Sequence, residues 1–346
     1  MAERDDFTRE EVERASRYHR PLYAALVADT LLGLVLLAAL TAVDLALPWW
    51  VEVAASPALA AAALWAVRLP LARWRLAHER RWGFSTQTTR GWWGDRAKAL
   101  AVGAVTTCLF VSPLLALAHR FPHRWPWLAA AGGAALTLLV SFVAPVLLEP
   151  VFNRFRPLEG ELAERVRAVA ERAGVPVREV LVADASRRTR KQNAYVSGVG
   201  RTRRVVLWDT LLDAPPEEVE LVVAHELGHR KHRHVLWLTL LAMAGVAAFV
   251  VVLRLARPHP QPADGPLVLL LGTLLELLAL PFAAALSRRF ERTADRFSLA
   301  VVGRREVFEA AHRRLALANL SDLEPPFLAY LLLFTHPTPP QRVRDT

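Results

Sequence analysis

Long apolar runs alternate with short charged segments along this chain. A membrane-spanning helix needs about 20 mostly apolar residues, and six runs meet that length. They are residues 21–47, 53–71, 99–118, 127–148, 235–253 and 267–286. Arg68 interrupts the second run, whereas the third, fourth and fifth carry no charge. The pattern predicts a mainly α, polytopic membrane helix bundle of about six spans.

Residues 150–234 follow a different pattern, with charged and apolar positions mixed as in a soluble α+β domain. An amphipathic helix is expected at residues 162–173. Short β-rich runs predict three strands, and Gly198, Gly200 and Thr202 predict a hairpin turn between the last two. The strands are expected at residues 180–183, 194–197 and 204–208.

The chain therefore divides into four regions. Residues 1–149 form an N-terminal membrane region with four spans, and residues 150–234 form a soluble part that ends in a histidine-rich helix. Residues 235–286 supply two further spans, and residues 287–346 form a soluble C-terminal part. Within the first region, the charged residues 10–20 are expected to form a short amphipathic helix at the membrane surface.

Composition agrees with a membrane protein. The chain is 53% hydrophobic with a mean hydropathy of +0.24. Its net charge of +10 comes with arginines at the ends of apolar runs and without a nucleic-acid motif, so we expect a lipid bilayer and no nucleic acid as partner. The single cysteine, Cys108, allows neither a disulfide within the chain nor a cysteine zinc cluster.

The arginine distribution orients the bundle. Arginines are favoured in cytoplasmic loops, and a cytoplasmic N-terminus places the arginine-rich loop at residues 72–98 inside, together with residues 150–234 and 287–346. Four arginines in the outer connections count against it: Arg120, Arg124, Arg254 and Arg257. We expect a multi-pass protein of the cell membrane with its candidate functional site on the cytoplasmic side.

Residues 213–234 carry the strongest chemical signal. Two prolines followed by two glutamates predict a helix start, and we expect this helix to run on into the fifth span. His225 and His229 lie four residues apart on one helix face and can hold one metal ion. Glu226 points off that face, where it can take a proton from water. The pentapeptide HELGH thus reads as the HExxH of a zinc peptidase, although a solvated, histidine-rich helix face is the simpler alternative.

A catalytic zinc site needs a third protein ligand and keeps a position for water. Glu291 and Asp295 follow the sixth run and lie four residues apart. We expect Glu291 to be the third ligand and Asp295 to accept the free ring N–H of a ligating histidine. The alternative is a solvated helix face on which both pair with neighbouring arginines.

Ordered motifs from about Thr8 to Arg342 resemble one family. They are EEVERASRYHR, RWGFSTQTTRGWWGD, VFNRFRPLEGEL, KQNAYVSGVG, RRVVLWDTLL, AHELGH, RRFERTAD and HPTPPQR. The chain is similar to the type I CAAX prenyl endopeptidases and their bacterial relatives. The eukaryotic members are membrane zinc peptidases that remove the last three residues of prenylated proteins.

The resemblance implies roles for particular residues. It implies one Zn²⁺ per chain on His225, His229 and Glu291, with Glu226 as base. It implies that Asn193, Ala194 and Tyr195 form an edge strand to which the substrate backbone adds. It also implies that His336 and Arg342 stabilise the tetrahedral oxyanion and bind substrate. Without the resemblance, a capping histidine and a solvated arginine would be the ordinary interpretation of the last two.

The family also implies a closed bundle around a water-filled chamber. Eukaryotic members carry an additional membrane helix before the region that matches this chain. Whether six spans close the wall of the chamber is therefore left undecided by the sequence. Glu276 lies at mid-depth of the sixth run. It either faces the chamber or pairs with a neighbouring helix.

These expectations define a membrane zinc endopeptidase that acts on peptide or protein substrates, with lipid-modified or membrane-associated proteins among them. A heat-shock-type quality-control metallopeptidase and a site-2-type intramembrane protease are alternatives. A non-catalytic zinc-containing membrane scaffold is a third. An open fourth position on the metal would argue against the scaffold, because structural zinc sites are normally closed by four protein ligands.

Overall fold

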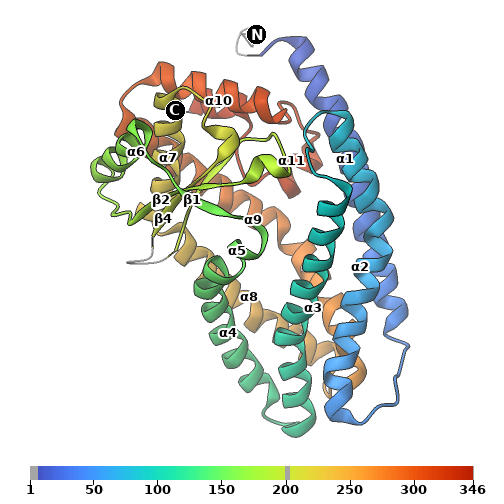
Figure 1. Cartoon of the computed structure of the whole chain (residues 1–346). Coiled ribbons are helices and arrows are strands. Elements are labelled where there is room, and N and C mark those ends of the chain that lie inside the picture. Colours follow the sequence, from blue (N-terminus) through green and yellow to red (C-terminus); the bar gives the residue numbers. More distant parts are fainter. Residues whose placement is uncertain (1–6, 199–202, 346) are drawn as a thin grey trace.

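The computed structural model describes residues 7–198 and 203–345. Figure 1 shows long helices below and a small sheet with shorter helices above them. The described part is mainly helical, with a four-stranded mixed sheet inserted between the fourth and fifth long helices. The predicted fold class is confirmed.

In the described part of the chain, six helices are long and apolar enough to cross a membrane. They are α1 (Arg9–Leu40), α2 (Trp49–Arg81), α3 (Thr89–Arg120), α4 (Trp125–Leu147), α8 (His234–Ala256) and α9 (Gly265–Val302). Each corresponds to one of the six predicted runs, although α1 ends at Leu40, seven residues before the end of the first run. Large apolar side chains such as Val35, Leu278 and Phe282 are exposed along these helices. Exposed apolar side chains in such helices are what contact with lipid requires.

Glu276 lies in the middle part of α9 and is exposed. Within residues 7–198 and 203–345 it forms no ion pair or hydrogen bond. The structure therefore gives no support to pairing with a neighbouring helix. An enclosed chamber around this carboxylate stays a prediction.

The first residues differ from the expectation. Residues 10–20 are the beginning of the 32-residue α1, and Thr8 and Glu11 form a capping box at its start. Tyr18 is fully buried, donates a hydrogen bond of 2.6 Å to Glu79 of α2 and stacks on His78. The prediction of a separate surface helix is wrong, because this segment buries its aromatic face inside the protein.

The sheet holds β1 (Phe155–Pro157), β2 (Glu179–Ala183), β3 (Ala194–Ser197) and β4 (Arg204–Trp208) in the order β1-β2-β4-β3. β2 and β4 are parallel, whereas β3 pairs antiparallel with β4. The three predicted strands are confirmed, and β1 was not predicted. Gly200 and Thr202 of the expected turn lie outside the described residues. β3 is an edge strand.

Shorter helices cover the sheet and the inner face of α9. They are α5 (Glu149–Phe152), α6 (Glu161–Arg172), α7 (Pro216–Lys231), α10 (Arg305–Asn319), α11 (Phe327–Leu333) and α12 (Pro339–Asp345). Val219, Val223 and Leu227 of α7 share a buried core with Val205 and Leu207 of β4. This core fixes α7 against the sheet.

α7 does not continue into the membrane as expected. It ends at Lys231, Arg233 adopts a left-handed conformation with φ of 55°, and α8 starts at His234. That prediction is wrong. Both flanking segments favour helix, so the position of the break depends on packing around it. His234 is buried, and its ring stacks on that of Phe290 of α9 with the ring centroids 4.2 Å apart.

Candidate metallopeptidase site

The site lies where α7 crosses α9. A Cβ on Gly228 would stand 3.1 Å from the Cα of Ala294, so the glycine permits a closer approach of the two helices than an alanine would. The crossing places Glu291 of α9 opposite His225 and His229 of α7. The solvated-face alternatives do not fit these residues, since His225 and Glu291 are buried.

The three side chains form a compact triangle of potential ligand atoms. Nε2 of His225 and Nε2 of His229 are 3.2 Å apart. Nε2 of His225 lies 3.3 Å from Oε2 of Glu291, and Nε2 of His229 lies 3.3 Å from Oε1 of the same carboxylate. A tetrahedral zinc ion with bonds of about 2.0–2.1 Å separates neighbouring ligand atoms by about 3.3 Å. The spacing of the two histidine nitrogens matches this value, and the three side chains each offer one ligand atom within 4.8 Å of the others, so the triangle can hold one zinc ion.

A second ring of contacts orients these ligands. Oδ1 of Asp295 lies 2.8 Å from Nδ1 of His225. Arg342 donates to Glu291 Oε2 at 2.6 Å and to Asp295 Oδ1 at 2.8 Å, and only 11% of its side chain is exposed. Asp295 therefore lies close to His225, and its role as acceptor of the ring N–H stays a prediction. A solvated Arg342 near the terminus is not what the structure shows.

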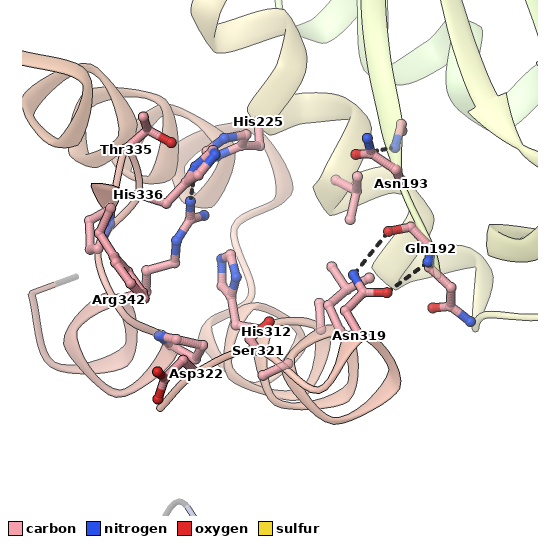
Figure 2. Close-up of a pocket in the computed structure, with 18 of the residues that line it drawn as sticks. Gln192, Asn193, His225, His312, Asn319, Ser321, Asp322, Thr335, His336 and Arg342 are labelled. Carbon is pink, nitrogen blue, oxygen red and sulfur yellow. Dashed lines mark hydrogen bonds between the residues drawn. The ribbon is translucent and has the colours of Figure 1, made fainter. Parts of the chain in front are cut away.

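His336 comes from the loop after α11. Its Nδ1 lies 2.6 Å from Oε2 of Glu291 and 3.1 Å from a guanidinium nitrogen of Arg342. The imidazole is still more than half exposed, which leaves it accessible to a ligand. Figure 2 shows His336 and Arg342 beside His225 on one side of a cavity.

Glu226 lines the same cavity as His225. Burial raises the pKa of the Glu226 carboxyl above its ordinary value. A desolvated carboxylate has a greater tendency to accept a proton, which is the property that a general base needs.

The cavity has a volume of about 420 Å³ and separates the ligand triangle from the sheet edge. Figure 2 shows Gln192 and Asn193 facing it from the side opposite His225 and Arg342, with His312 between the two groups. A space of this size accommodates a few residues of an extended peptide.

The edge strand β3 is close to α7, the helix that carries His225 and His229. The N–H of Trp208 donates to the carbonyl of Asn193, so the main-chain groups of Asn193 face β4. Because these groups alternate in direction along a strand, the N–H and C=O groups of Ala194 and Val196 point to the open edge. Arg230, which directly follows His229, donates to the carbonyl of Val196 at 2.6 Å. The main-chain groups of Tyr195 face β4, and its hydroxyl lies 3.4 Å from Oε2 of Glu149.

Three further residues were not predicted from the sequence. His234 places its Nδ1 2.9 Å from Nδ1 of His229. His312 lies 3.8 Å from Asp295, and burial lowers its pKa to about 3, so the ring is neutral. Arg230 contacts the edge strand. The motif HELGHRKHRH contains two of these residues, but their contacts depend on the break after α7 and on the sheet.

Fold and side-chain arrangement together define a polytopic membrane protein with an HExxH metallopeptidase-type site. Residues 157–346 match the model of peptidase family M48, and residues 2–154 match the model described as CAAX prenyl protease N-terminal, five membrane helices. The chain belongs to peptidase family M48, a zinc-dependent family. Four candidate spans lie within residues 2–154 of this structure.

Individual relatives agree with this assignment. The uncharacterized metalloprotease YhfN of Bacillus subtilis is 30% identical over 279 residues, which cover 76% of this chain and 66% of that protein. CAAX prenyl protease 1 of Saccharomyces cerevisiae is 34% identical over 177 residues, which cover 49% of this chain and 38% of the yeast protein. The matched regions thus span less than two thirds of either relative.

A solved structure shows the same fold. The crystal structure of S. mikatae Ste24p superposes with a TM-score of 0.80 at 22% identity, and the match covers 99% of this chain and 89% of that one. The resemblance to CAAX prenyl proteases inferred from the motifs is confirmed.

Proposed function

We propose that the protein is a zinc-dependent membrane endopeptidase with one Zn²⁺ per chain. The observation that carries this proposal is the triangle of His225, His229 and Glu291 beside the buried Glu226, at one end of a cavity that reaches an open strand edge. Within the described part of the chain, His225, His229 and Glu291 form a group of side chains that could hold a metal ion. One tetrahedral position would remain for water, as in catalytic rather than structural zinc sites.

Zinc at this triangle would supply Lewis-acid polarisation of the scissile carbonyl and a lowered pKa of the attacking water. Glu226 accepts the proton of that water at its carboxylate and delivers it to the nitrogen of the leaving amine. The burial that raises the pKa of Glu226 suits it to both transfers.

His336 and Arg342 support the opposite side of the site. The exposed His336 imidazole offers an N–H to the negative charge that develops on the carbonyl oxygen. Arg342 bridges Glu291 and Asp295 through its planar fork, so its main role is to hold the third ligand in place. Asp295 in turn orients the His225 ring.

The edge of β3 aligns the substrate. A peptide that adds to Ala194 and Val196 as a further strand would run past the cavity wall beside α7. Its main-chain hydrogen bonds would replace the bonds that the side chains of Asn193 and Arg230 form at this edge. Asn193 sits at the entry of this edge, where its side-chain oxygen accepts from the N–H of Ala194 at 2.9 Å. Tyr195 supports the strand from its other face.

Substrates are peptides or proteins that reach this edge from the membrane or from the cytoplasm. Relatives named CAAX prenyl protease make the carboxyl-terminal segments of prenylated proteins one class to test. The arginine distribution supports a catalytic site on the cytoplasmic side of the cell membrane.

Metal removal tests the proposal. Purified, detergent-solubilised protein is incubated with quenched peptides, prenylated and unmodified, before and after dialysis against a zinc chelator. We expect cleavage that is lost on chelation and restored by a stoichiometric amount of zinc. Stoichiometric zinc without cleavage of any peptide would instead support the scaffold alternative.

A further inference from the structure

A second cavity system lies away from the zinc triangle, between α2 and α3. A groove of about 280 Å³ is lined by small and apolar side chains at its membrane side and by Arg68 and Arg96 at the end near the soluble part. The same two arginines also line a larger cavity of about 740 Å³ between α1, α2 and the soluble part. The two spaces therefore meet at these guanidinium groups.

The charge around this meeting point is positive. The larger cavity is lined by five basic side chains against two acidic ones: Arg68, Arg75, Arg96, Arg188 and Lys191 against Asp29 and Glu79. The groove itself is lined by two arginines and no acidic residue. A cavity lined by an excess of basic side chains attracts an anion.

Arg96 is the cation best placed to bind one. Its Nε is buried and has no hydrogen-bond partner within residues 7–198 and 203–345. Its guanidinium forms no ion pair there and lies over the ring of Trp92, 5.7 Å from the ring centroid. The neighbouring carboxylate, Asp95, is already held by both arms of Arg188. Arg96 is thus a partly buried charge without a counter-ion.

Arg68 completes the positive end of the groove. It forms an ion pair of 3.2 Å with Asp29 of α1. A Cβ on Gly33 would come within 2.6 Å of its Nη2, so the glycine leaves room for the guanidinium. Trp65, three residues earlier, donates to the carbonyl of Arg96 at 3.1 Å and ties the two helices together at this level.

Depth in the bilayer identifies the kind of anion. Trp49 and His119 stack on each other and mark the far end of α2 and α3. From that end, Arg68 lies about 28 Å along α2 and Arg96 about 35 Å along α3, at 1.5 Å per residue. The hydrocarbon core is about 30 Å thick, so Arg96 lies beyond its boundary and Arg68 lies just inside it. From there the long side chain of Arg68 extends outward to the level of the lipid phosphates.

The groove runs from the arginines back into the hydrocarbon. Leu64 of α2 and Leu100 and Thr107 of α3 line it, and a Cβ built on Gly103 meets nothing within 4 Å, so its floor is open. An apolar groove at hydrocarbon depth that ends in cations at phosphate depth has the shape and charge of one acyl chain with its headgroup.

We propose that this groove binds an anionic phospholipid. The phosphate lies between Arg96 and Arg68, and an acyl chain follows α2 and α3 past Gly103. The lipid binds outside the zinc triangle and stabilises the packing of α2 against α3. This site is independent of the proposed peptidase function, because no residue of the triangle contributes to it.

Native mass spectrometry of the full-length, zinc-loaded protein tests the site, with phosphatidylglycerol, phosphatidylcholine and inorganic phosphate as probes. We expect phosphatidylglycerol to bind about fivefold or more tightly than phosphatidylcholine. The variant Arg96→Gln should lose this preference. Arg90→Gln, an exposed arginine of the same helix that lines none of these cavities, should keep it.

A second variant tests the chain groove. Gly103→Leu adds its side chain to open space, so the helix should fold, and it should weaken binding of both lipids. Equal affinity for the two lipids, or a preference that survives Arg96→Gln, would overturn the proposal. Inorganic phosphate bound as tightly as phosphatidylglycerol would show a free-anion site instead of a lipid site.

Discussion

Asp295 lies where it would orient a ligand of the proposed zinc site without touching the metal. Its carboxylate is almost fully buried and lies between His225 and Arg342, at 2.8 Å from each. The contact with Nδ1 of His225 fixes the ring so that Nε2 points toward Glu291. Partners of this kind raise the basicity of the ligating histidine and hold its orientation.

The variant Asp295→Asn keeps the shape of the side chain and removes its charge. We expect zinc affinity to fall by about 10- to 100-fold, measured by competition with a chromogenic chelator. Asp213→Asn, an exposed change just before α7, serves as the control and should bind zinc like the wild type. Equal zinc affinity in both variants would mean that Asp295 does not orient His225.

Residues of the site differ in how far the sequence reveals them. His225, Glu226 and His229 follow from spacing on one helix, and Glu291 follows from the need for a third ligand at the end of the next long helix. The contacts of Arg342 could not be predicted, because its partners lie about 50 residues earlier in the chain and are reached only when α12 packs near α9.

At the scale of elements, the break between α7 and α8 determines where His234 lies relative to the site. Arg233 takes the left-handed conformation, and the turn brings His234 back over His229 and against Phe290. A continuous helix would carry the residue at position 234 away from the ligand face. Hydropathy could not reveal the break, because both sides form helix and the break depends on burial of a single ring.

His234→Phe tests this arrangement. Phenylalanine keeps the stacking on Phe290 and removes the nitrogen that contacts His229, so we expect a stable protein with about 10-fold or more weaker zinc binding. His259→Phe, in the exposed loop between α8 and α9, is the matched control. Unchanged zinc affinity in His234→Phe would show that the contact has no part in holding the second ligand.

At the scale of the whole molecule, six long apolar runs were sufficient to predict the membrane helices. The attachment of the soluble part was not predictable in the same way. Tyr18 of α1 bonds to Glu79 of α2 and receives a hydrogen bond from Lys191, just before the edge strand. These contacts join the first two membrane helices to the peptidase part through polar side chains far apart in sequence.

Topology follows from the same architecture. In a Cys108→Ala background, we expect a cysteine at exposed His123 to react with a membrane-impermeant maleimide in intact cells. A cysteine at exposed Arg190 should react only after the membrane is opened, because arginine-rich segments remain in the cytoplasm. The reverse labelling pattern would place the site outside the cell.

The most direct measurement of the central claim compares zinc content and peptide cleavage in the wild type, Glu226→Gln and Glu291→Ala. We expect one zinc per chain and active cleavage in the wild type. Glu226→Gln should retain the zinc and lose turnover by about 10²- to 10⁴-fold, because the proton acceptor is gone while the ligands remain. Glu291→Ala should lose both zinc and activity. Cleavage by Glu226→Gln at the wild-type rate would contradict the assignment of this site as a zinc peptidase centre.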